Sequence, residues 1–354
     1  MKRLADICDI QYGYAFDSKC FTEDSSYPQL VRIRDVKRGY SETYYSGDYP
    51  EEYILSEGDL LIGMDGEFNI ARWKCSGALL NQRVCKLTTK VGTNEEYLRF
   101  AMLKSLKEIE QRTAFVTVKH LSVKELNKLE LDVPELTKQD KIADTLSRLE
   151  RVIEARKEEL EKLDNLIKAR FVEMFGDPRS NPFGFSKSVL KDTCKVVTGN
   201  TPSRAVQEYY GNYVEWIKTD NIVSEMINPT KATESLSEEG MKVGRTVDKD
   251  SILMACIAGS IASIGKVCVT DRTVAFNQQI NAIVPEEYNI LFLYVLLQLS
   301  KDYLIEDINM ALKGILSKSK LEEKEFIVPP MELQKQFADF VDQVDKSKVI
   351  KLSN

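Results

Sequence analysis

The sequence predicts a mixed α/β (α+β) protein. We expect two tandem globular units joined by long helices, which form an antiparallel coiled coil around an approximate two-fold axis. Three observations predict this fold: an internal repeat, a heptad pattern between the two halves, and short strand-like segments within each half. A chain of 354 residues is long enough for two or three domains. We divide it into a first unit, a long helix, a second unit and a second helix, at residues 1–133, 134–176, 177–328 and 329–354.

The internal repeat relates the two halves at an offset near 186 residues at the start and 195 at the end. Leu4–Cys8 matches Leu190–Cys194, and Asn81 with Gln82 matches Asn277 with Gln278. The matches near the end of each half are Leu121 with Leu316, Leu126 with Leu321, Pro134 with Pro329, Gln139 with Gln334 and Asp144 with Asp339. Each half is therefore predicted to be a globular unit followed by a helix.

Within each half, short β-branched runs alternate with Gly, Asn and Asp turns, which is typical of strands and loops. Gln29–Val36 and Asp250–Ile257 are two of these runs. One amphipathic helix stands out in each half, near Glu95–Glu110 and Asn289–Ile305. We expect each unit to contain a twisted sheet and one such helix.

A long helix is predicted over Glu135–Phe175, because apolar residues recur there at alternating steps of four and three, the spacing of a coiled coil. Pro134 blocks the helix upstream, while Gly176 and Pro178 supply a C-terminal stop. At a rise of 1.5 Å per residue, about 40 residues make a rod of roughly 60 Å. The apolar positions of this seam are Ile142, Leu146, Leu149, Ile153, Leu160, Leu163, Ile167 and Met174.

A second, shorter helix is predicted after Pro330, with Phe337, Val341 and Val344 at the same steps. In a unit–helix–unit–helix chain the two helices can lie antiparallel, which relates the units by an approximate two-fold axis. That symmetry matches the antiparallel strands of a duplex. Because the second helix is short, we expect part of the Leu160–Met174 seam to lack a partner within the chain.

The composition argues against an enzyme. Seven cysteines are scattered without a C-x-x-C pair and His120 is the single histidine, so neither a zinc site nor a disulfide framework is expected. We expect reduced, mostly buried thiols. A Ser-His-Asp or Cys-His arrangement would have to use His120, and no activated nucleophile is recognisable near it.

The chain is expected to be cytoplasmic and to bind no membrane. It contains no run of eighteen apolar residues, and its start turns acidic at Asp6 before any apolar core appears. The formal net charge is -6 and none of the four segments is basic overall. Binding to nucleic acid must therefore use local basic patches and contacts shared with a partner.

Several short strings occur in the same order in both halves, with the long helix between them. They are Gln11–Phe16, Leu30–Val36, Gly58–Ile62 and Leu80–Val84 in the first half, Val197–Arg204, Tyr209–Ile217, Ala258–Val267 and Phe276–Gln279 in the second, and Phe171–Pro178 at the helix end. Over essentially the whole chain, this order resembles the specificity subunit of type I restriction-modification enzymes, with two target recognition domains that are each followed by a conserved helical region.

The resemblance implies a non-catalytic subunit that binds double-stranded DNA. Each recognition domain would read one half of a split site in the major groove, and the helices would set the number of base pairs between the halves. The helices would also dock methyltransferase subunits, expected to be two, with restriction and translocase subunits added for cleavage. The implied cofactor, S-adenosylmethionine, belongs to the methyltransferase, and no cofactor is expected in this chain.

Sequence readout needs donors and acceptors at base edges, and affinity needs phosphate contacts. Arg32, Arg34, Lys37 and Arg38 place four basic groups within seven residues, which favours DNA binding over a solvated surface for this cluster. The other candidates for DNA contacts are Arg72, Lys74, Lys119, His120, Arg204, Lys218, Asn221, Lys242, Arg245, Lys266 and Lys313. For each of these singly, a solvated surface is the stronger interpretation. Trp73 and Trp216 are expected in the cores rather than stacked on bases.

The alternative function is a scaffold in which the tandem units bind protein partners and the coiled coil dimerises, and the acidic net charge favours it slightly. The short second helix bears on both functions. A second copy of the chain or a methyltransferase subunit is expected to cover the unpaired part of the Leu160–Met174 seam.

Overall fold

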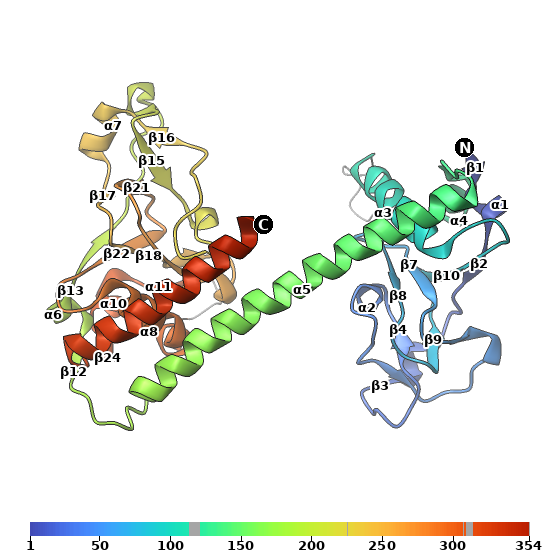
Figure 1. The fold of residues 1–354 in the computed structure, drawn as a ribbon, viewed down its shortest axis with the longest axis horizontal. Helices are drawn as coiled ribbons and strands as arrows, with labels where there is room; N and C mark the ends of the chain where they lie inside the picture. Colours follow the sequence, from blue (N-terminus) through green and yellow to red (C-terminus); the bar gives the residue numbers. More distant parts are fainter. Residues whose placement is uncertain (113–120, 225, 307, 309–313, 354) are drawn as a thin grey trace. The chain divides into compact units, whose positions relative to one another are not determined.

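The computed structural model describes residues 1–112, 121–224, 226–306, 308 and 314–353. The chain forms two compact units, Met1–Arg156 and Lys157–Asn354, and the division falls inside helix α5 (Leu136–Phe175). Figure 1 shows α5 continuing without a break from one unit into the other. The predicted long helix over Glu135–Phe175 is confirmed. Mixed helix and sheet in both units confirms the predicted fold class.

Unit 1 is built on a four-stranded antiparallel sheet in the order β2 (Cys8–Tyr12), β10 (Val84–Thr89), β7 (Leu60–Gly63), β8 (Asn69–Arg72). In a second sheet, β9 (Ala78–Leu80) lies between a parallel neighbour, β4 (Leu30–Val31), and an antiparallel one, β6 (Ile54–Leu55). The other elements are β1 (Lys2–Arg3) paired with β11 (Glu130–Leu131), β3 (Phe21–Thr22) paired with β5 (Tyr44–Tyr45), α1 (Leu4–Ile7), α2 (Ile33–Val36), α3 (Glu95–Arg112) and α4 (Val123–Lys128).

The core of unit 1 lies between the four-stranded sheet and α3. Two residues of β7, Leu60 and Ile62, are buried with two of β10, Cys85 and Leu87. In each pair the residues are two apart, as a sheet with one face on the core requires. Leu98 and Met102 of α3 are buried in the same cluster, four residues apart on one helix face. The helix predicted near Glu95–Glu110 is therefore confirmed as α3.

Unit 2 repeats this topology. Its four-stranded sheet has the order β13 (Cys194–Thr198), β22 (Ile280–Pro285), β18 (Ile252–Ala255), β20 (Val267–Val269). Its second sheet has the order β14 (Tyr210–Gly211), β16 (Ser235–Leu236), β15 (Val214–Ile217), β21 (Val274–Phe276), β17 (Thr246–Val247), in which β15 and β21 are parallel. The other elements are β12 (Lys187–Val189) paired with β24 (Glu325–Ile327), β19 (Ile257–Ala258) paired with β23 (Gly314–Ile315), α6 (Leu190–Thr193), α7 (Glu238–Val243), α8 (Ile290–Leu299), α9 (Lys301–Ile305), α10 (Lys318–Glu322) and α11 (Met331–Ser353).

The helix predicted over Asn289–Ile305 is in fact two helices. Ser300 ends α8 and precedes α9, and its backbone leaves the helical region at φ -92° and ψ 12°. Asn289 begins α8 as an N-cap whose side chain accepts hydrogen bonds from the backbone of Leu291 and Phe292. The continuous apolar pattern of the two helices concealed this break.

The repeat extends to a buried amide at the start of each long helix. In unit 1, Gln139 accepts a hydrogen bond from the backbone N–H of Asn94 at 2.9 Å and donates one to the carbonyl of Pro134 at 2.7 Å. In unit 2, Gln334 makes the same pair of bonds, with the N–H of Asn289 at 2.9 Å and the carbonyl of Pro329 at 2.8 Å. Both amides are 1% exposed, so each fixes a helix start to the cap of α3 or α8.

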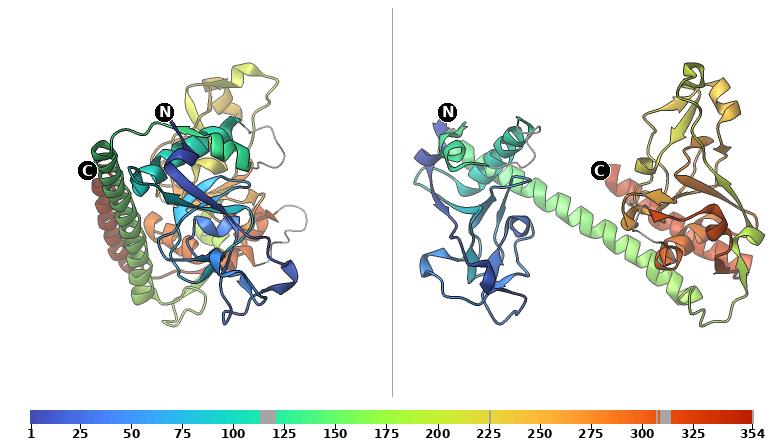
Figure 2. Two further views of the ribbon diagram at one scale, coloured as in Figure 1. Left: turned by 90° about the vertical axis from the view of Figure 1, so that its right-hand side faces the viewer. Right: turned by 180° about the vertical axis from the view of Figure 1, so that it is seen from behind.

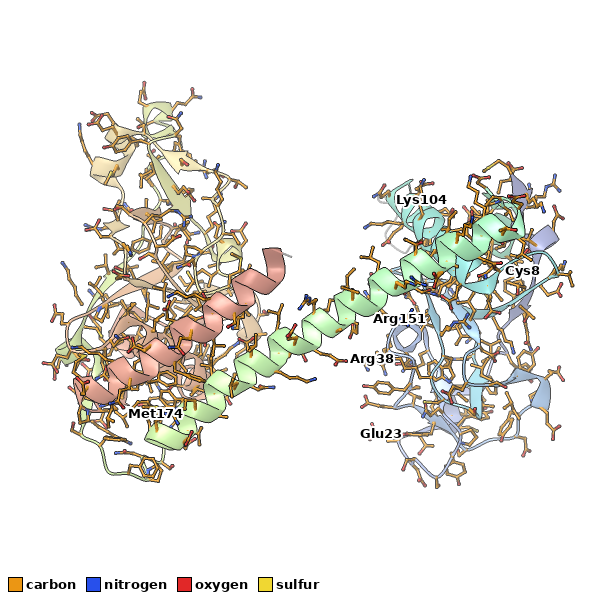
Figure 3. The ribbon with its side chains drawn as sticks, viewed as in Figure 1. Cys8, Glu23, Arg38, Lys104, Arg151 and Met174 are labelled. Carbon is orange, nitrogen blue, oxygen red and sulfur yellow. The ribbon has the colours of Figure 1, made fainter. Side chains whose placement is uncertain are left out.

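Helices α5 and α11 run antiparallel in unit 2, as predicted, and lie side by side in both views of Figure 2. Phe171 of α5 meets Phe337 of α11 with 5.4 Å between ring centroids, while Lys348 further along α11 forms an ion pair with Asp164. Met174 lies near the end of α5 (Figure 3), where it packs on the same core.

The expectation that part of the Leu160–Met174 seam lacks a partner in the chain is wrong from Leu163 onward. Ile167 is buried with Val341 and Val344 of α11, and Leu163 and Met174 are packed against that core. The expectation compared the lengths of α5 and α11 but did not consider the register in which the two helices pair. In the antiparallel pair, α11 begins beside the C-terminal end of α5 and therefore covers that end first.

The exposed part of the seam lies earlier in α5. Leu149 is 53% exposed and Ile153 46%, together with Val152 on the neighbouring position. By the repeat offset of 195, Leu149 corresponds to Val344, which is buried in unit 2 because the last turns of α5 pack on it. Leu149 in unit 1 is therefore exposed, whereas its counterpart in unit 2, Val344, is buried.

The cysteines are unpaired, and five of the seven are buried. Trp73 and Trp216 are 1% and 3% exposed, so both lie in the cores as expected. In the part of the chain that the structure describes, no helix is long and apolar enough to cross a bilayer.

Candidate nucleic-acid interface

The basic cluster Arg32–Arg38 is organised by a buried carboxylate. Asp35, which is 2% exposed, accepts hydrogen bonds from the backbone N–H of Arg32 at 3.0 Å and from the hydroxyl of Ser41 at 3.0 Å. The first bond closes a capping interaction at the start of α2. As a result, Arg32, Arg34, Lys37 and Arg38 lie exposed on the turn while the acid between them is buried.

Three of these four basic groups have only loose ion pairs. The separations are 3.7 Å for Arg34–Asp35, 3.5 Å for Lys37–Glu67 and 3.8 Å for Arg38–Glu42. The Lys37 and Arg38 pairs are exposed at both ends, and such pairs contribute about 0–1 kcal/mol, so a phosphate can replace these two carboxylates at little cost. Within the described residues Arg32 has no ion pair at all. Figure 3 shows Arg38 at the surface beside α2.

Arg32 and Arg34, together with Gln82 and Arg83, line a concave surface that encloses a volume of about 460 Å³. Arg83 was missed in the sequence, although it lies within the Leu80–Val84 string. Its backbone has φ 71°, which is uncommon for a residue other than glycine. Its side chain is half exposed and pairs with Asp65 at 2.7 Å. The structure therefore gathers three arginines and one exposed amide, from two segments far apart in the sequence.

Lys74 lies beside this cluster, whereas Arg72 has a structural role. The side chain of Lys74 crosses Gly39, where an added Cβ would lie 2.7 Å from the lysine Cγ and where the backbone φ of 81° favours glycine. Arg72 forms ion pairs with Glu95, at 2.6 Å, and with Glu96, and donates to the carbonyl of Gly58 at 2.7 Å. These contacts fasten β8 to α3 and remove Arg72 from the candidates for DNA contacts.

In unit 2 the repeat places Lys218 and Asn221 at the positions of Arg32 and Asp35. Asn221 is 7% exposed and accepts a hydrogen bond from the backbone N–H of Lys218 at 3.0 Å. It also donates to Thr230 and to the carbonyl of Lys231. Asn221 is thus a buried capping residue like Asp35, and its side chain is occupied within the protein.

Arg204 and Lys218 converge on Glu234. Arg204 pairs with this carboxylate at 2.6 Å, and Lys218 hydrogen-bonds to its other oxygen. The hydrogen bond from Lys218, together with Arg204, holds the pKa of Glu234 below its usual range. The guanidinium of Arg204 also lies over the rings of Tyr210, at 4.4 Å, and Trp216, at 5.1 Å. The group is a polar cluster at the surface of the second sheet of unit 2.

The remaining candidates are scattered. Lys242 pairs with Glu239 on the same helix, and Arg245 is exposed beside Asn200, whose side chain accepts its backbone N–H at 2.7 Å. Lys266 lies in a separate cleft of unit 2. Lys119, His120 and Lys313 lie outside the described residues. Among the residues that are described, no group of three or more His, Cys, Asp or Glu side chains could hold a metal ion.

The fold and its paired polar surfaces define a class: tandem units of one topology, each followed by a helix. The profile of the "Type I restriction modification DNA specificity domain" family matches residues 1–165 and 182–353, so the chain belongs to this family. The resemblance drawn from the sequence is confirmed.

Two relatives and one solved structure agree with this family. Over 166 residues, or 47% of this chain and 35% of the relative, the chain is 39% identical to the type I restriction enzyme EcoBI specificity subunit of Escherichia coli. Over 33% of this chain and 25% of the relative, it is 32% identical to the HindI specificity subunit of Haemophilus influenzae. The matches therefore span about a third or less of these relatives. The type I S subunit structure from M. genitalium covers 99% of this chain and 90% of its own, with a TM-score of 0.62 at 15% identity, and so shares the fold.

Proposed function

We propose that this chain is the DNA sequence-recognition subunit of a type I restriction-modification complex. The observation that carries the proposal is the family match to both halves of the chain. Each half is one globular unit with its own polar surface, which fits a target read in two parts. Methylation and cleavage would be carried out by partner subunits, with S-adenosylmethionine bound by the methyltransferase.

We infer that unit 1 reads DNA with the concave surface around Arg32, Arg34, Gln82 and Arg83. Arginine can donate two hydrogen bonds to guanine, and glutamine can pair with the edge of adenine. Lys37 and Arg38 follow Arg34 in the sequence, and Lys74 contacts the next residue, Gly39. We propose that these three basic side chains bind the phosphates beside the bases that are read.

The same positions in unit 2 carry different chemistry. The repeat places Lys218, Asp220, Gln278 and Gln279 where unit 1 has Arg32, Arg34, Gln82 and Arg83. An acid in place of Arg34 favours a cytosine amino group rather than guanine as a partner. We therefore propose that the two half-sites differ, and that the target is bipartite and asymmetric.

The partner subunits are proposed to dock on the exposed stretch of α5 around Leu149, Val152 and Ile153. The equivalent of Leu149 in unit 2 is buried against a helix, so a helix of a methyltransferase subunit or of a second copy of the chain fits this stretch. This proposal replaces the docking site first expected over Leu160–Met174.

The test is to express the chain together with a type I methyltransferase subunit and to sequence the methylated bases of the host DNA. Methylation at a split, asymmetric motif that disappears when the chain is omitted supports the proposal. If methylation is the same without the chain, and the purified chain binds no duplex at low salt, the proposal fails and the protein-scaffold alternative is favoured.

A further inference from the structure

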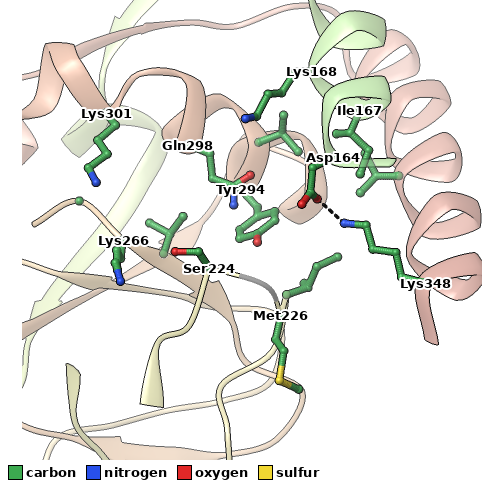
Figure 4. A pocket seen from close by; sticks show the side chains of 15 residues that line it. Asp164, Ile167, Lys168, Ser224, Met226, Lys266, Tyr294, Gln298, Lys301 and Lys348 are labelled. Atoms are coloured by element: carbon green, nitrogen blue, oxygen red, sulfur yellow. Dashed lines mark hydrogen bonds and ion pairs between the residues drawn. The ribbon is translucent and has the colours of Figure 1, made fainter. Parts of the chain in front are cut away.

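Unit 2 contains a cleft of about 280 Å³ that lies apart from the Arg204–Glu234 cluster. It is bounded by the C-terminal half of α5, by the turn before β20 and by the helices α8 and α9. Lys168, Lys266 and Lys301 line it from three of these elements, as Figure 4 shows. Three lysines that are far apart in the sequence therefore border one small cleft.

None of these three ammonium groups has an ion pair within the described residues. The only protein partner of Lys301 Nζ among them is the carbonyl of Ala262 at 2.6 Å, which leaves two of its protons for a ligand. Asp164 is the one carboxylate in the lining, and Lys348 already neutralises it (Figure 4). The described lining therefore has a net charge near +3, in a chain whose formal net charge is -6.

The cleft also offers neutral donors. Tyr294 is 5% exposed and lines the cleft beside Gln298. Burial, with Asp164 and Asp345 nearby, raises the pKa of the Tyr294 phenol, so its hydroxyl keeps its proton and remains a donor at neutral pH. A ligand in the cleft would thus meet hydrogen-bond donors as well as positive charge.

We propose that this cleft binds phosphate groups through Lys168, Lys266 and Lys301. A single carboxylate would leave two of the three charges unbalanced, whereas a phosphate carries up to two charges and three acceptor oxygens. Two sources share this chemistry: consecutive phosphates of a DNA backbone, and a small diphosphate-bearing molecule. The DNA source rests on the proposed function, and the small-molecule source does not.

The test variant is Lys168→Gln with Lys266→Gln, which removes two charges and leaves the Lys301–Ala262 contact in place. Lys162→Gln is the matched control, because Lys162 lies on the same helix and is exposed with only a 3.9 Å pair to Glu158. Circular dichroism and the thermal midpoint check that all three proteins fold alike. Duplex binding is then measured with the full chain from low to moderate salt, and the thermal shift with inorganic pyrophosphate is measured at matched ionic strength.

If the cleft holds backbone phosphates, the slope of log affinity against log salt becomes less steep by about 0.9 for each lysine removed, and the control keeps the original slope. If it holds a small ligand, DNA binding is unchanged, but the stabilisation by pyrophosphate is lost in the double variant alone. The proposal is overturned if the double variant matches the control in both measurements. Failure of the unmodified chain to bind any duplex would contradict the proposed function, while the pyrophosphate measurement would still decide about the cleft.

Discussion

Asp35 and Asn221 make the same capping hydrogen bond with the backbone, although one side chain is a carboxylate and the other a neutral amide. Each accepts the N–H three residues before it and holds a basic residue at the surface, Arg32 in one unit and Lys218 in the other. The sequence placed Asn221 among the candidates for DNA contacts, because the residue pattern does not show that its side chain is buried. The repeat indicates a capping role instead. The counterpart of Asn221 in unit 1 is Asp35, and a carboxylate at a DNA-binding surface would repel phosphates.

Replacing Arg34 by Glu is expected to abolish sequence-specific modification without unfolding the chain. Arg34 is 63% exposed and makes one loose contact, so its removal costs little stability, while the new charge repels phosphate. Methylation of host DNA and the urea midpoint measure the two effects. Glu42→Gln is a control at the edge of the same cluster. Normal methylation by Arg34→Glu would exclude this surface as the reader in unit 1.

Glu234→Gln is expected to lower stability at neutral pH and to have less effect in acid. The pKa of Glu234 is depressed in the folded protein, so its contribution is present above the unfolded pKa and is lost as pH falls through the folded value. The difference in urea midpoint between variant and parent should therefore be largest near pH 7 and shrink below about pH 4. A difference that is constant with pH would mean that the ion pairs with Arg204 and Lys218 contribute nothing.

Two of the seven cysteines are expected to react with a thiol reagent in the folded protein. Burial raises the pKa of Cys8, Cys85, Cys194, Cys256 and Cys268 to about 12, so their reactive thiolate forms are scarce and shielded. Cys20 and Cys75 are partly exposed. A colorimetric titration should count about two thiols before denaturation and all seven after it. Rapid reaction of all seven in native buffer would contradict the buried cores.

At the scale of elements, the sequence predicted α3, α5 and α11 well. Apolar residues recur every 3.5 or 3.6 residues along an amphipathic helix, and this period does not depend on which element the helix packs against. It did not predict the break at Ser300, since apolar residues continue from α8 to Leu304 and Ile305 of α9 and the break depends on the backbone conformation of one residue. The concave surface with Arg83 also could not be predicted. It joins two segments about 50 residues apart, and the parallel pairing of β4 with β9 brings them together.

Phe171→Ala is expected to destabilise unit 2 by about 3–5 kcal/mol, because the side chain is fully buried and stacks on Phe292 as well as contacting Phe337. Val172→Ala, one residue later on the exposed side of α5, is the control and should cost little. Both substitutions are made in a Trp73→Phe background, so that the fluorescence followed during chemical denaturation comes from Trp216 and reports on unit 2. Equal effects of the two substitutions would contradict the position of α5 in this core.

At the scale of the whole molecule, α5 is one continuous helix with its two ends in different units. If it sets the spacing between half-sites, inserting seven residues after Ile153 adds two turns, or about 10 Å, and should lengthen the spacer by about three base pairs. Sequencing of methylated bases should show both half-sites unchanged. Inserting two residues rotates one end of the helix by about 200° relative to the other and should abolish modification. A change in the half-sites themselves would refute the spacer role.

The division of α5 near Arg156 has a consequence for inheritance. Phe171 and Phe175 belong to the second core, although the sequence-based division placed both of them in the helix before the second globular unit. A genetic exchange at Gly176 would give that core phenylalanines from a different ancestor, whereas an exchange near Arg156 would transfer each core complete. Viable recombinants of this protein should therefore have their crossover points in the middle of the helix, on an exposed stretch where neither core depends on the residues that are joined.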